Sequence, residues 1–314
     1  MTISADTFAF VADLVRRTSA IQLEPGKEYL VESRVLPLAR AAGMSGVDAY
    51  VADLRVHPSA QRTAEVVEAL TTNETSWFRD IAPFQALAEH VVPALGEGGR
   101  PSRLRVWSAA CSTGQEPYSI AITLADALGP GVPLEITATD LNAQVLERAR
   151  TGTYTQLEVN RGLPAATLVR HFRRAGSGWQ VADELRRQVA FRQHNLLDAP
   201  PLGGPFDVVF LRNVLIYFDL PTKRAVLERV RGALRPGGYL VLGAAETTIG
   251  VHDAYERVVA GRATVYRAPD GPSRPAAPPA PRAVVPTAAA ALPTPSRAGA
   301  VVHAYPSTRG AGLR

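Results

Sequence analysis

The chain has 314 residues, 46% of them hydrophobic, which is enough for one large domain and a smaller one, each with a packed core. Its single cysteine excludes an intrachain disulfide framework and is typical of a reducing compartment. The net charge of +5 comes mostly from arginines scattered along the chain. This scatter favours an arginine-rich composition over a nucleic-acid footprint and leaves open a positive face for an acidic protein partner.

Signals for targeting, membrane insertion and metal binding are not evident in the sequence. Met1 is not followed by a basic and then apolar leader, and no window approaches the roughly 18–20 apolar residues of a membrane span. We therefore expect a cytoplasmic protein without membrane insertion. His90, His171 and His194 show no ligand-like spacing, so we predict no metal site.

The first 70 residues have the pattern of helices. Apolar residues cluster at helical spacing in four groups, which lie at 8–15, 29–38, 47–54 and 66–70. Gly43 and Pro58 separate groups, and the pattern predicts a small helical bundle. Pro37 lies within the second group, where a proline kinks a helix or marks its end.

Between Leu70 and Arg267 strand-like and helix-like segments alternate, which is typical of a mainly parallel sheet with helices on both faces. The predicted strands are Arg105–Ala109, Leu134–Thr139, Gln188–Arg192, Phe206–Leu211, Tyr239–Gly243 and Ala263–Arg267. The predicted helices are Pro117–Leu128, Ala143–Arg150 and Pro221–Leu234. The sequence thus predicts an α/β fold.

Two segments depart from this alternation. Within residues 168–191, a Gly-Ser-Gly turn at 176–178 between Val169–Arg173 and Trp179–Val181 predicts a small hairpin inserted between core elements. Residues 268–314 are rich in Pro and Ala and have little apolar periodicity. Such a tail cannot bury enough surface to offset the entropy of ordering, so we expect it to be disordered.

The stretch from Arg103 to Asp140 combines a strand, a small-residue turn to Gly114, a helix with Glu116 in its first turn, and a strand that stops at Asp140. A doubly wound sheet holds an adenosine in this way, with the second strand's acid accepting from the ribose hydroxyls. Because the turn has one glycine, where a dinucleotide fingerprint has three, the sequence favours an adenosine cofactor without a pyrophosphate. The alternatives are that Asp140 caps the next helix and that Glu116 only complements a helix dipole.

Four stretches, in order and with compatible spacing, resemble one family. They are LTTNETSWFR at 70–79, ACSTGQEPYS at 110–119, ATD at 138–140 and FDVVFLRNVLIYF at 206–218, the last followed by LRPGG at 234–238. They are similar to motifs of the chemotaxis-receptor glutamate O-methyltransferases of the CheR type, which are class I S-adenosyl-L-methionine-dependent methyltransferases. The resemblance covers roughly residues 8 to 267.

The resemblance implies a fold, a cofactor and a reaction. The fold is a Rossmann-like, mostly parallel seven-stranded sheet whose last strand runs antiparallel, with a small all-α N-terminal domain and a small inserted β-hairpin subdomain. S-adenosyl-L-methionine supplies a methyl group to the γ-carboxylate of glutamates in the cytoplasmic domain of a chemoreceptor, for sensory adaptation. We expect a monomer with a receptor-recognition domain at 1–70, a methyltransferase domain at 71–267 that includes the hairpin subdomain at about 168–191, and a tail at 268–314.

The same motifs imply the site residues. Those expected to bind the cofactor are Asn73, Thr75, Arg79, Glu116, Asp140, Asn195, Leu196, Arg212 and Asn213. Arg79 and Tyr217 are the implied catalytic residues, since a guanidinium binds carboxylates in a fork and a tyrosine hydroxyl can orient one. The residues alone leave alternatives: Thr72 or Asn73 caps a helix through Arg79, residues 195–196 form an ordinary turn, and Tyr217 lies in the core.

Three positions differ from the family pattern. Gln115 stands where a second acid is usual, and Pro37 and Leu38 stand at positions that are usually basic in the helix that meets the receptor. The compact Gly-Ser-Gly turn favours a member that needs no tethering peptide from the receptor. Two other hypotheses are a methyltransferase of this fold that acts on another protein or a small molecule, and a cofactor-binding module without catalysis.

Overall fold

The computed structural model describes residues 3–96, 101–129 and 131–270. Contacts within the chain divide it into two units, 1–276 and 277–314, and all described residues belong to the first. The tail at 268–314 is expected to be disordered, and its residues 271–314 lie outside the described ranges.

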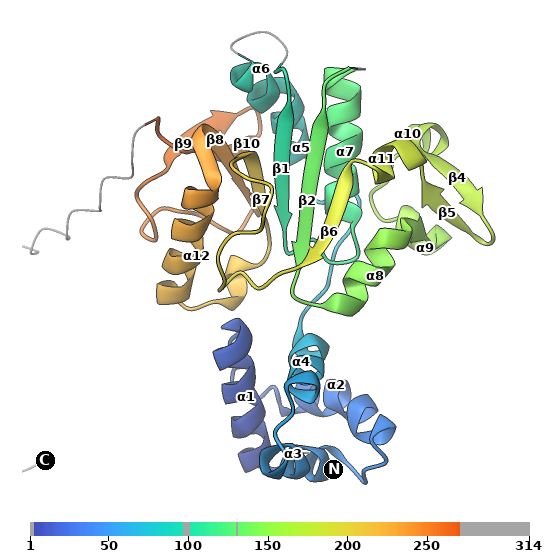
Figure 1. Cartoon of the computed structure of the whole chain (residues 1–314), viewed down its shortest axis with the longest axis vertical. Helices are drawn as coiled ribbons and strands as arrows, with labels where there is room; N and C mark the ends of the chain where they lie inside the picture. Colours follow the sequence, from blue (N-terminus) through green and yellow to red (C-terminus); the bar gives the residue numbers. More distant parts are fainter. Residues whose placement is uncertain (1–2, 97–100, 130, 271–314) are drawn as a thin grey trace, which may run out of the picture. The chain divides into compact units, whose positions relative to one another are not determined.

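The all-α N-terminal part predicted from the sequence is confirmed (Figure 1). Its helices are α1 (Ala5–Ser19), α2 (Glu28–Ala41), α3 (Val47–Val56) and α4 (Ala60–Leu70). Residues four apart lie on one face of a helix, and here such pairs are fully buried in a common core, among them Val11 with Val15 and Val31 with Val35. Burial of one apolar face therefore holds each helix in place.

The proline in α2 does not end the helix, which continues through Pro37 to Ala41, so that part of the sequence prediction is wrong. Pro37 and Ser33, whose carbonyl loses its helical partner, both lie on the exposed side, where water can satisfy that carbonyl. Val35 and Ala39 are fully buried on the other side and hold the helix against the core. Packing therefore outweighs the cost of the proline.

The main sheet has seven strands, as predicted: β1 (Leu104–Ala109), β2 (Leu134–Asp140), β6 (Val189–Gln193), β7 (Phe206–Leu211), β8 (Leu234–Leu242), β9 (Glu256–Ala260) and β10 (Ala263–Arg267). Their order is β6-β2-β1-β7-β8-β10-β9. The first five in this order run parallel, and β10 pairs antiparallel with both neighbours. The chain moves outward from β1 to β6 and then returns to β7, so the strand order reverses between β1 and β7.

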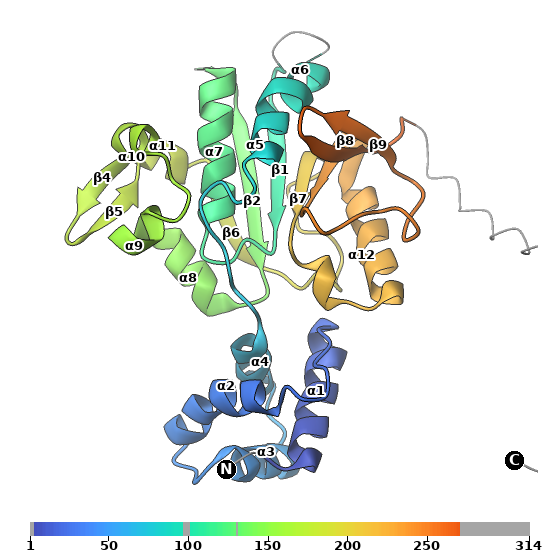
Figure 2. The same ribbon diagram turned by 180° about the vertical axis from the view of Figure 1, so that it is seen from behind.

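Alternate strand residues enter separate cores on the two faces of the sheet. In β7, Val208 and Phe210 join a core with one group of helices, whereas Val209 and Leu211 join a core with α12 (Leu220–Ala233). The first group consists of α5 (Ala82–Ala86), the π-helix η1 (Leu87–Val91), α6 (Val92–Leu95), α7 (Gln115–Leu128) and α8 (Ala143–Thr151). The opposite views of Figure 1 and Figure 2 show these two helical layers with the sheet between them.

A second, antiparallel sheet contains the predicted hairpin and one further strand. It consists of β3 (Thr153–Tyr154), β4 (Phe172–Ala175) and β5 (Gly178–Val181), in the order β3-β5-β4. Three short helices accompany it: α9 (Gln156–Val159), α10 (Ala165–His171) and α11 (Asp183–Arg186). The hairpin is confirmed, but Val169 lies in α10, so the strand predicted from that residue begins later.

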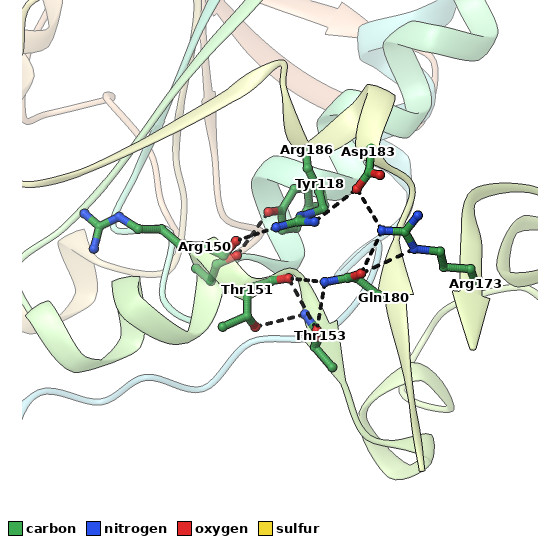
Figure 3. A network of polar contacts seen from close by, with 9 residues as sticks. Tyr118, Arg150, Thr151, Thr153, Arg173, Gln180, Asp183 and Arg186 are labelled. Carbon is green, nitrogen blue, oxygen red and sulfur yellow. Dashed lines mark hydrogen bonds and ion pairs between the residues drawn. The ribbon is translucent and has the colours of Figure 1, made fainter. Parts of the chain in front are cut away.

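Polar contacts and aromatic rings fasten this small sheet to its surroundings. Gln180 on β5 donates to the carbonyl oxygen of Thr151 at 3.0 Å, next to the end of α8 (Figure 3). Asp183 accepts from Arg173 at 3.0 Å and from Arg186 at 3.1 Å, which joins β4 to α11. These contacts tie the small sheet to the end of α8.

The ring of Trp77 lies edge-on to two rings of the small sheet. Its centroid is 4.9 Å from that of Tyr154 on β3 and 5.2 Å from that of Phe172 on β4. Trp77 is almost fully buried, so these contacts anchor the segment that follows α4, whose other residues are partly or fully exposed. The small sheet is therefore part of the same packed body as the main sheet.

Element boundaries differ from the predictions where prolines, glycines or exposure blur the pattern. The helices α5 to α6 are not predicted, because Pro83 and Pro93 interrupt the helical spacing. β8 begins at Leu234, ahead of the predicted Tyr239, because Gly237 and Gly238 form part of the strand. β9 is not predicted either, since most of its residues are exposed.

We expect Gly162→Ala to destabilise the protein strongly. Gly162 has a φ of +98°, and a Cβ there would lie 2.1 Å from the carbonyl oxygen of Trp77. Gly176→Ala is the matched control, because Gly176 also has a positive φ, +57°, but open space around it. The left-handed conformation alone costs about 1–2 kcal/mol, and overpacking adds about 1–3 kcal/mol. Urea unfolding followed by circular dichroism should show the larger loss for Gly162→Ala; equal losses would contradict this account of the contact.

Candidate functional site

A pocket lies where β1, β2 and β7 end, at the edge where a doubly wound sheet keeps its ligand site. All ten residues singled out from the sequence line it, namely Asn73, Thr75, Arg79, Glu116, Asp140, Asn195, Leu196, Arg212, Asn213 and Tyr217. They come from segments spread between Asn73 and Tyr217, and the fold brings them together. Their individual roles stay predictions.

Asp140 ends β2 and is 7% exposed. Its two carboxylate oxygens accept from the backbone N–H groups of Ser112 at 2.8 Å and Asn142 at 2.9 Å. The N-cap of α8 is Asn142, whose side chain accepts from Gln144 and Val145, so the alternative that Asp140 caps this helix is wrong. Burial raises the pKa of Asp140, and the backbone hydrogen bonds oppose that rise.

The turn after β1 needs a glycine for its shape and its packing. Gly114 has a φ of +94°, and a Cβ there would lie 2.9 Å from the hydroxyl of Tyr154 and 3.0 Å from the Cβ of Ala149. Tyr154 also donates to the carbonyl oxygen of Thr113 at 2.8 Å. The turn is therefore clamped between α8 and the small sheet.

Glu116 lies in the first turn of α7, and both of its carboxylate oxygens have partners. One accepts from the hydroxyl of Ser108 at 2.8 Å, and the other lies 3.1 Å from Nη1 of Arg212. Burial raises the pKa of Glu116, and the charge of Arg212 opposes this rise. The carboxylate is thus held at the pocket wall in a fixed orientation.

Arg212 follows β7, and its side chain is only 1% exposed. Besides Glu116, its guanidinium contacts the carboxylate of Asp80 at 3.1 Å and the carbonyl oxygen of Arg79 at 2.7 Å. These contacts show that much of its hydrogen-bonding capacity serves the protein itself. A cofactor contact for Arg212 remains a prediction.

The segment after α4 is extended, and no helix runs from Asn73 to Arg79. The alternative that Thr72 or Asn73 caps such a helix is therefore wrong. The backbone of Asn73 accepts from the hydroxyl of Ser112 at 2.8 Å, which brings this segment to the turn after β1. Phe78 and Asp80 have positive φ angles of 46° and 56°, so Arg79 lies between two residues in an uncommon conformation.

The N-terminal helices form part of the pocket wall. Asn195, in the loop after β6, donates to the carbonyl oxygen of Thr18 in α1 at 2.7 Å and accepts from Leu197 at 3.1 Å. Gln22 donates its backbone N–H to the carbonyl oxygen of Tyr217 at 3.1 Å. Tyr217 packs against the core that contains α12 but stays partly exposed in the pocket, so it is not a fully buried core residue.

Several lining residues were missed by sequence reasoning. They include Ser19, Ile21, Thr71, Ser76, Ser112, His194, Val214 and Phe218. Ser112 and Ser76 lie inside the sequence motifs, so their position in those motifs could have identified them as pocket residues. Ser19 and Ile21 lie far from every motif, and only the fold brings them to the site.

Within residues 3–96, 101–129 and 131–270, no group of three or more His, Cys, Asp or Glu side chains is placed to hold a metal ion. None of the helices in the described ranges is long and apolar enough to cross a membrane. The polar groups of the pocket are instead carboxylates, amides, hydroxyls, the imidazole of His194 and two arginines, Arg79 and Arg212. Arg79 also makes a 3.0 Å bond to the carbonyl oxygen of Glu74.

This donor set fits a molecule with hydroxyls at one end and an amino acid at the other. The buried carboxylate of Asp140 uses one lone pair of each oxygen for a backbone N–H, which leaves acceptor capacity for a pair of hydroxyls. Glu116 and Arg79 supply opposite charges for an ammonium and a carboxylate. Asp140 ends β2 and Asn213 follows β7, and these strands lie on either side of β1, about 10 Å apart at two strand spacings.

Comparisons with known proteins agree with this geometry. The family model of the CheR methyltransferase SAM binding domain matches residues 73–264, and that of the CheR methyltransferase all-alpha domain matches residues 6–71. The chain is 42% identical to chemotaxis protein methyltransferase 1 of Pseudomonas aeruginosa over 262 residues, which cover 81% of this chain and 94% of that one.

Two further relatives give the same result. The chemotaxis protein methyltransferase of Vibrio parahaemolyticus is 39% identical over 272 residues, which cover 85% of this chain and 98% of the relative. That of Salmonella typhimurium is 40% identical over 247 residues, which cover 76% of this chain and 83% of the relative. The chain therefore belongs to the CheR methyltransferase family and is an S-adenosyl-L-methionine-dependent methyltransferase.

Proposed function

We propose that the protein transfers a methyl group from S-adenosyl-L-methionine to the γ-carboxylate of glutamate residues in the cytoplasmic domain of a chemoreceptor. The products are a glutamate methyl ester and S-adenosylhomocysteine, and the reaction serves sensory adaptation. The observation that carries the proposal is that one pocket collects Asp140, Glu116 and Arg79 with Asn213 and Tyr217 at one sheet edge. The named relatives, all chemotaxis methyltransferases, support the receptor as substrate.

In this proposal the cofactor lies across the ends of β2, β1 and β7. Asp140 accepts hydrogen bonds from the two ribose hydroxyls, and Asn195 and Leu196 flank the adenine. Glu116, Asn213 and Arg79 face the methionine portion, with Asn73 and Thr75 above it. All of these residues line the pocket, and the buried carboxylates of Asp140 and Glu116 are already oriented by their hydrogen bonds.

In this reaction the protein mainly aligns the glutamate carboxylate with the methyl group, and proton transfer is of less importance. The bound cofactor supplies an electrophilic methyl group on a sulfonium. A glutamate carboxylate is ionised at neutral pH, so the protein needs no general base to activate it. Arg79 and Tyr217 hold that carboxylate in line with the methyl group, and the pocket excludes water from a transition state in which opposite charges partly cancel.

The chain's other regions receive roles in the same proposal. Residues 1–70 recognise the receptor, 71–267 carry the cofactor and the chemistry with the small sheet inserted, and the tail at 268–314 has no role here. Arg40, exposed in the last turn of α2, suits an acidic group on the receptor. We infer a monomer, because one chain supplies the whole pocket lining, and a cytoplasmic location, where the receptor substrate lies.

We expect Asp140→Ala to weaken the binding of S-adenosylhomocysteine at least about tenfold, because it removes charge-assisted hydrogen bonds to the ribose. Titration calorimetry on the full chain measures this. Asp126→Ala is the control, since Asp126 is a partly exposed aspartate on α7 that is ion-paired with Arg170. Unchanged affinity in Asp140→Ala would show that Asp140 does not hold the ribose.

Binding of S-adenosylhomocysteine should also weaken on acidification. Burial raises the pKa of Asp140 above its ordinary value, so the carboxylate takes up a proton at a higher pH than an exposed aspartate does. The ionised form accepts the ribose hydroxyls, and affinity therefore falls as pH drops through that raised pKa. Calorimetry from neutral pH downward tests this, and Asp140→Ala should lose less affinity on acidification than the unmodified chain, because of the two buried carboxylates only Glu116, whose pKa burial also raises, then remains to take up a proton.

Methyl transfer itself should be measured with radiolabelled S-adenosyl-L-methionine and cytoplasmic fragments of chemoreceptors. We expect base-labile label on glutamate residues, because a carboxyl methyl ester hydrolyses in alkali. Asp140→Ala provides the background. Base-stable label, label on another acceptor, or cofactor binding without transfer would each contradict the proposed reaction.

A further inference from the structure

The carboxylate of Glu246, in the loop after β8, accepts hydrogen bonds from four backbone N–H groups. Its Oε2 accepts from Asn213 at 2.7 Å and Gly243 at 2.8 Å. Its Oε1 accepts from Val214 at 2.9 Å and Leu215 at 2.7 Å. Glu246 does not line the pocket, and no sequence motif considered above includes it.

Three of these four donors belong to the turn that carries pocket residues. Asn213 has a φ of 58°, a left-handed conformation that a residue with a side chain adopts at a cost. Val214 and Leu215 lead into the short 3₁₀ helix η2 (Leu215–Tyr217), which ends at Tyr217. One carboxylate therefore fixes the backbone on which both Asn213 and Tyr217 stand.

Gly243 makes this arrangement sterically tight. A Cβ at this position would lie 2.7 Å from Oε2 of Glu246, 2.8 Å from Nδ2 of Asn213 and 2.9 Å from the backbone nitrogen of Asn213. Even one methyl group would therefore push the carboxylate and the Asn213 turn apart. The end of β8 and the turn after its neighbour β7 are thus packed against each other through Glu246.

We infer that Glu246 is a positioning residue for the methyl transfer, which holds Asn213 against the methionine portion of the cofactor and Tyr217 against the substrate. This rests on the proposed function of the pocket. The charge is essential because four N–H donors face one group. A glutamine in its place turns an NH₂ group toward two of those donors and leaves them without an acceptor.

The test separates the two ends of the cofactor. In Glu246→Gln, the dissociation constant of S-adenosylhomocysteine should rise at least about tenfold, the weight of one charge-assisted hydrogen bond. The constant of 5′-methylthioadenosine, which lacks the amino-acid portion, should stay within about twofold, because Asp140 and the adenine wall are untouched. The kcat of methyl transfer in Glu246→Gln should also fall, since the backbone that carries Tyr217 shifts as well. A merely structural role would weaken both ligands in parallel.

Two further variants make the outcome decisive. Gly243→Ala displaces the same carboxylate from the other side and should give the same split between the two ligands. Glu256→Gln, which removes an exposed charge on β9, should leave both affinities unchanged. Parallel weakening, no weakening, or loss of folding in both Glu246→Gln and Gly243→Ala would overturn the positioning role. Failure of the unmodified chain to bind either ligand would instead overturn the proposed function.

Discussion

The site depends on one buried cation. The guanidinium of Arg212, at the end of β7, contacts Glu116 at the start of α7 and both Asp80 and the Arg79 backbone in the segment after α4. A buried charge without partners costs several kcal/mol, so these three parts of the chain are stable only together. The same contact opposes the rise in the pKa of Glu116 that burial causes, and so favours a carboxylate that stays ionised at the pocket wall.

The helical N-terminal part and the sheet meet at the pocket through the backbone. Thr18 and Gln22, on either side of the end of α1, bond to Asn195 and to the carbonyl oxygen of Tyr217. Asn142, which caps α8, donates to the carbonyl oxygen of Glu68 in α4. The region to which we assign receptor recognition therefore shares the pocket wall with the region to which we assign the chemistry.

The sequence was most informative where a function is encoded locally. Asp140 and Glu116 could be found because a strand, a turn and a helix follow one another within forty residues and their residue types are typical of an adenosine site. Glu246 and Ser19 could not, since their significance comes from strands and helices that are distant in sequence. The continuation of α2 through Pro37 could not be predicted from the sequence either. It depends on the burial of Val35 and Ala39 against other helices, which is a tertiary effect.

The contact between Tyr154 and the turn at Gly114 limits how this enzyme can be recombined. Tyr154 belongs to the small sheet, yet its hydroxyl bonds to Thr113 and its ring meets Trp77, in the two segments that border the pocket. If the small sheet were exchanged between relatives, Tyr154 would therefore come from one parent and its contact residues Thr113 and Trp77 from the other. Chimeras should keep their activity only when the junction is placed so that Tyr154, Gly114 and Trp77 descend from the same parent, and natural variation at these three positions should be correlated.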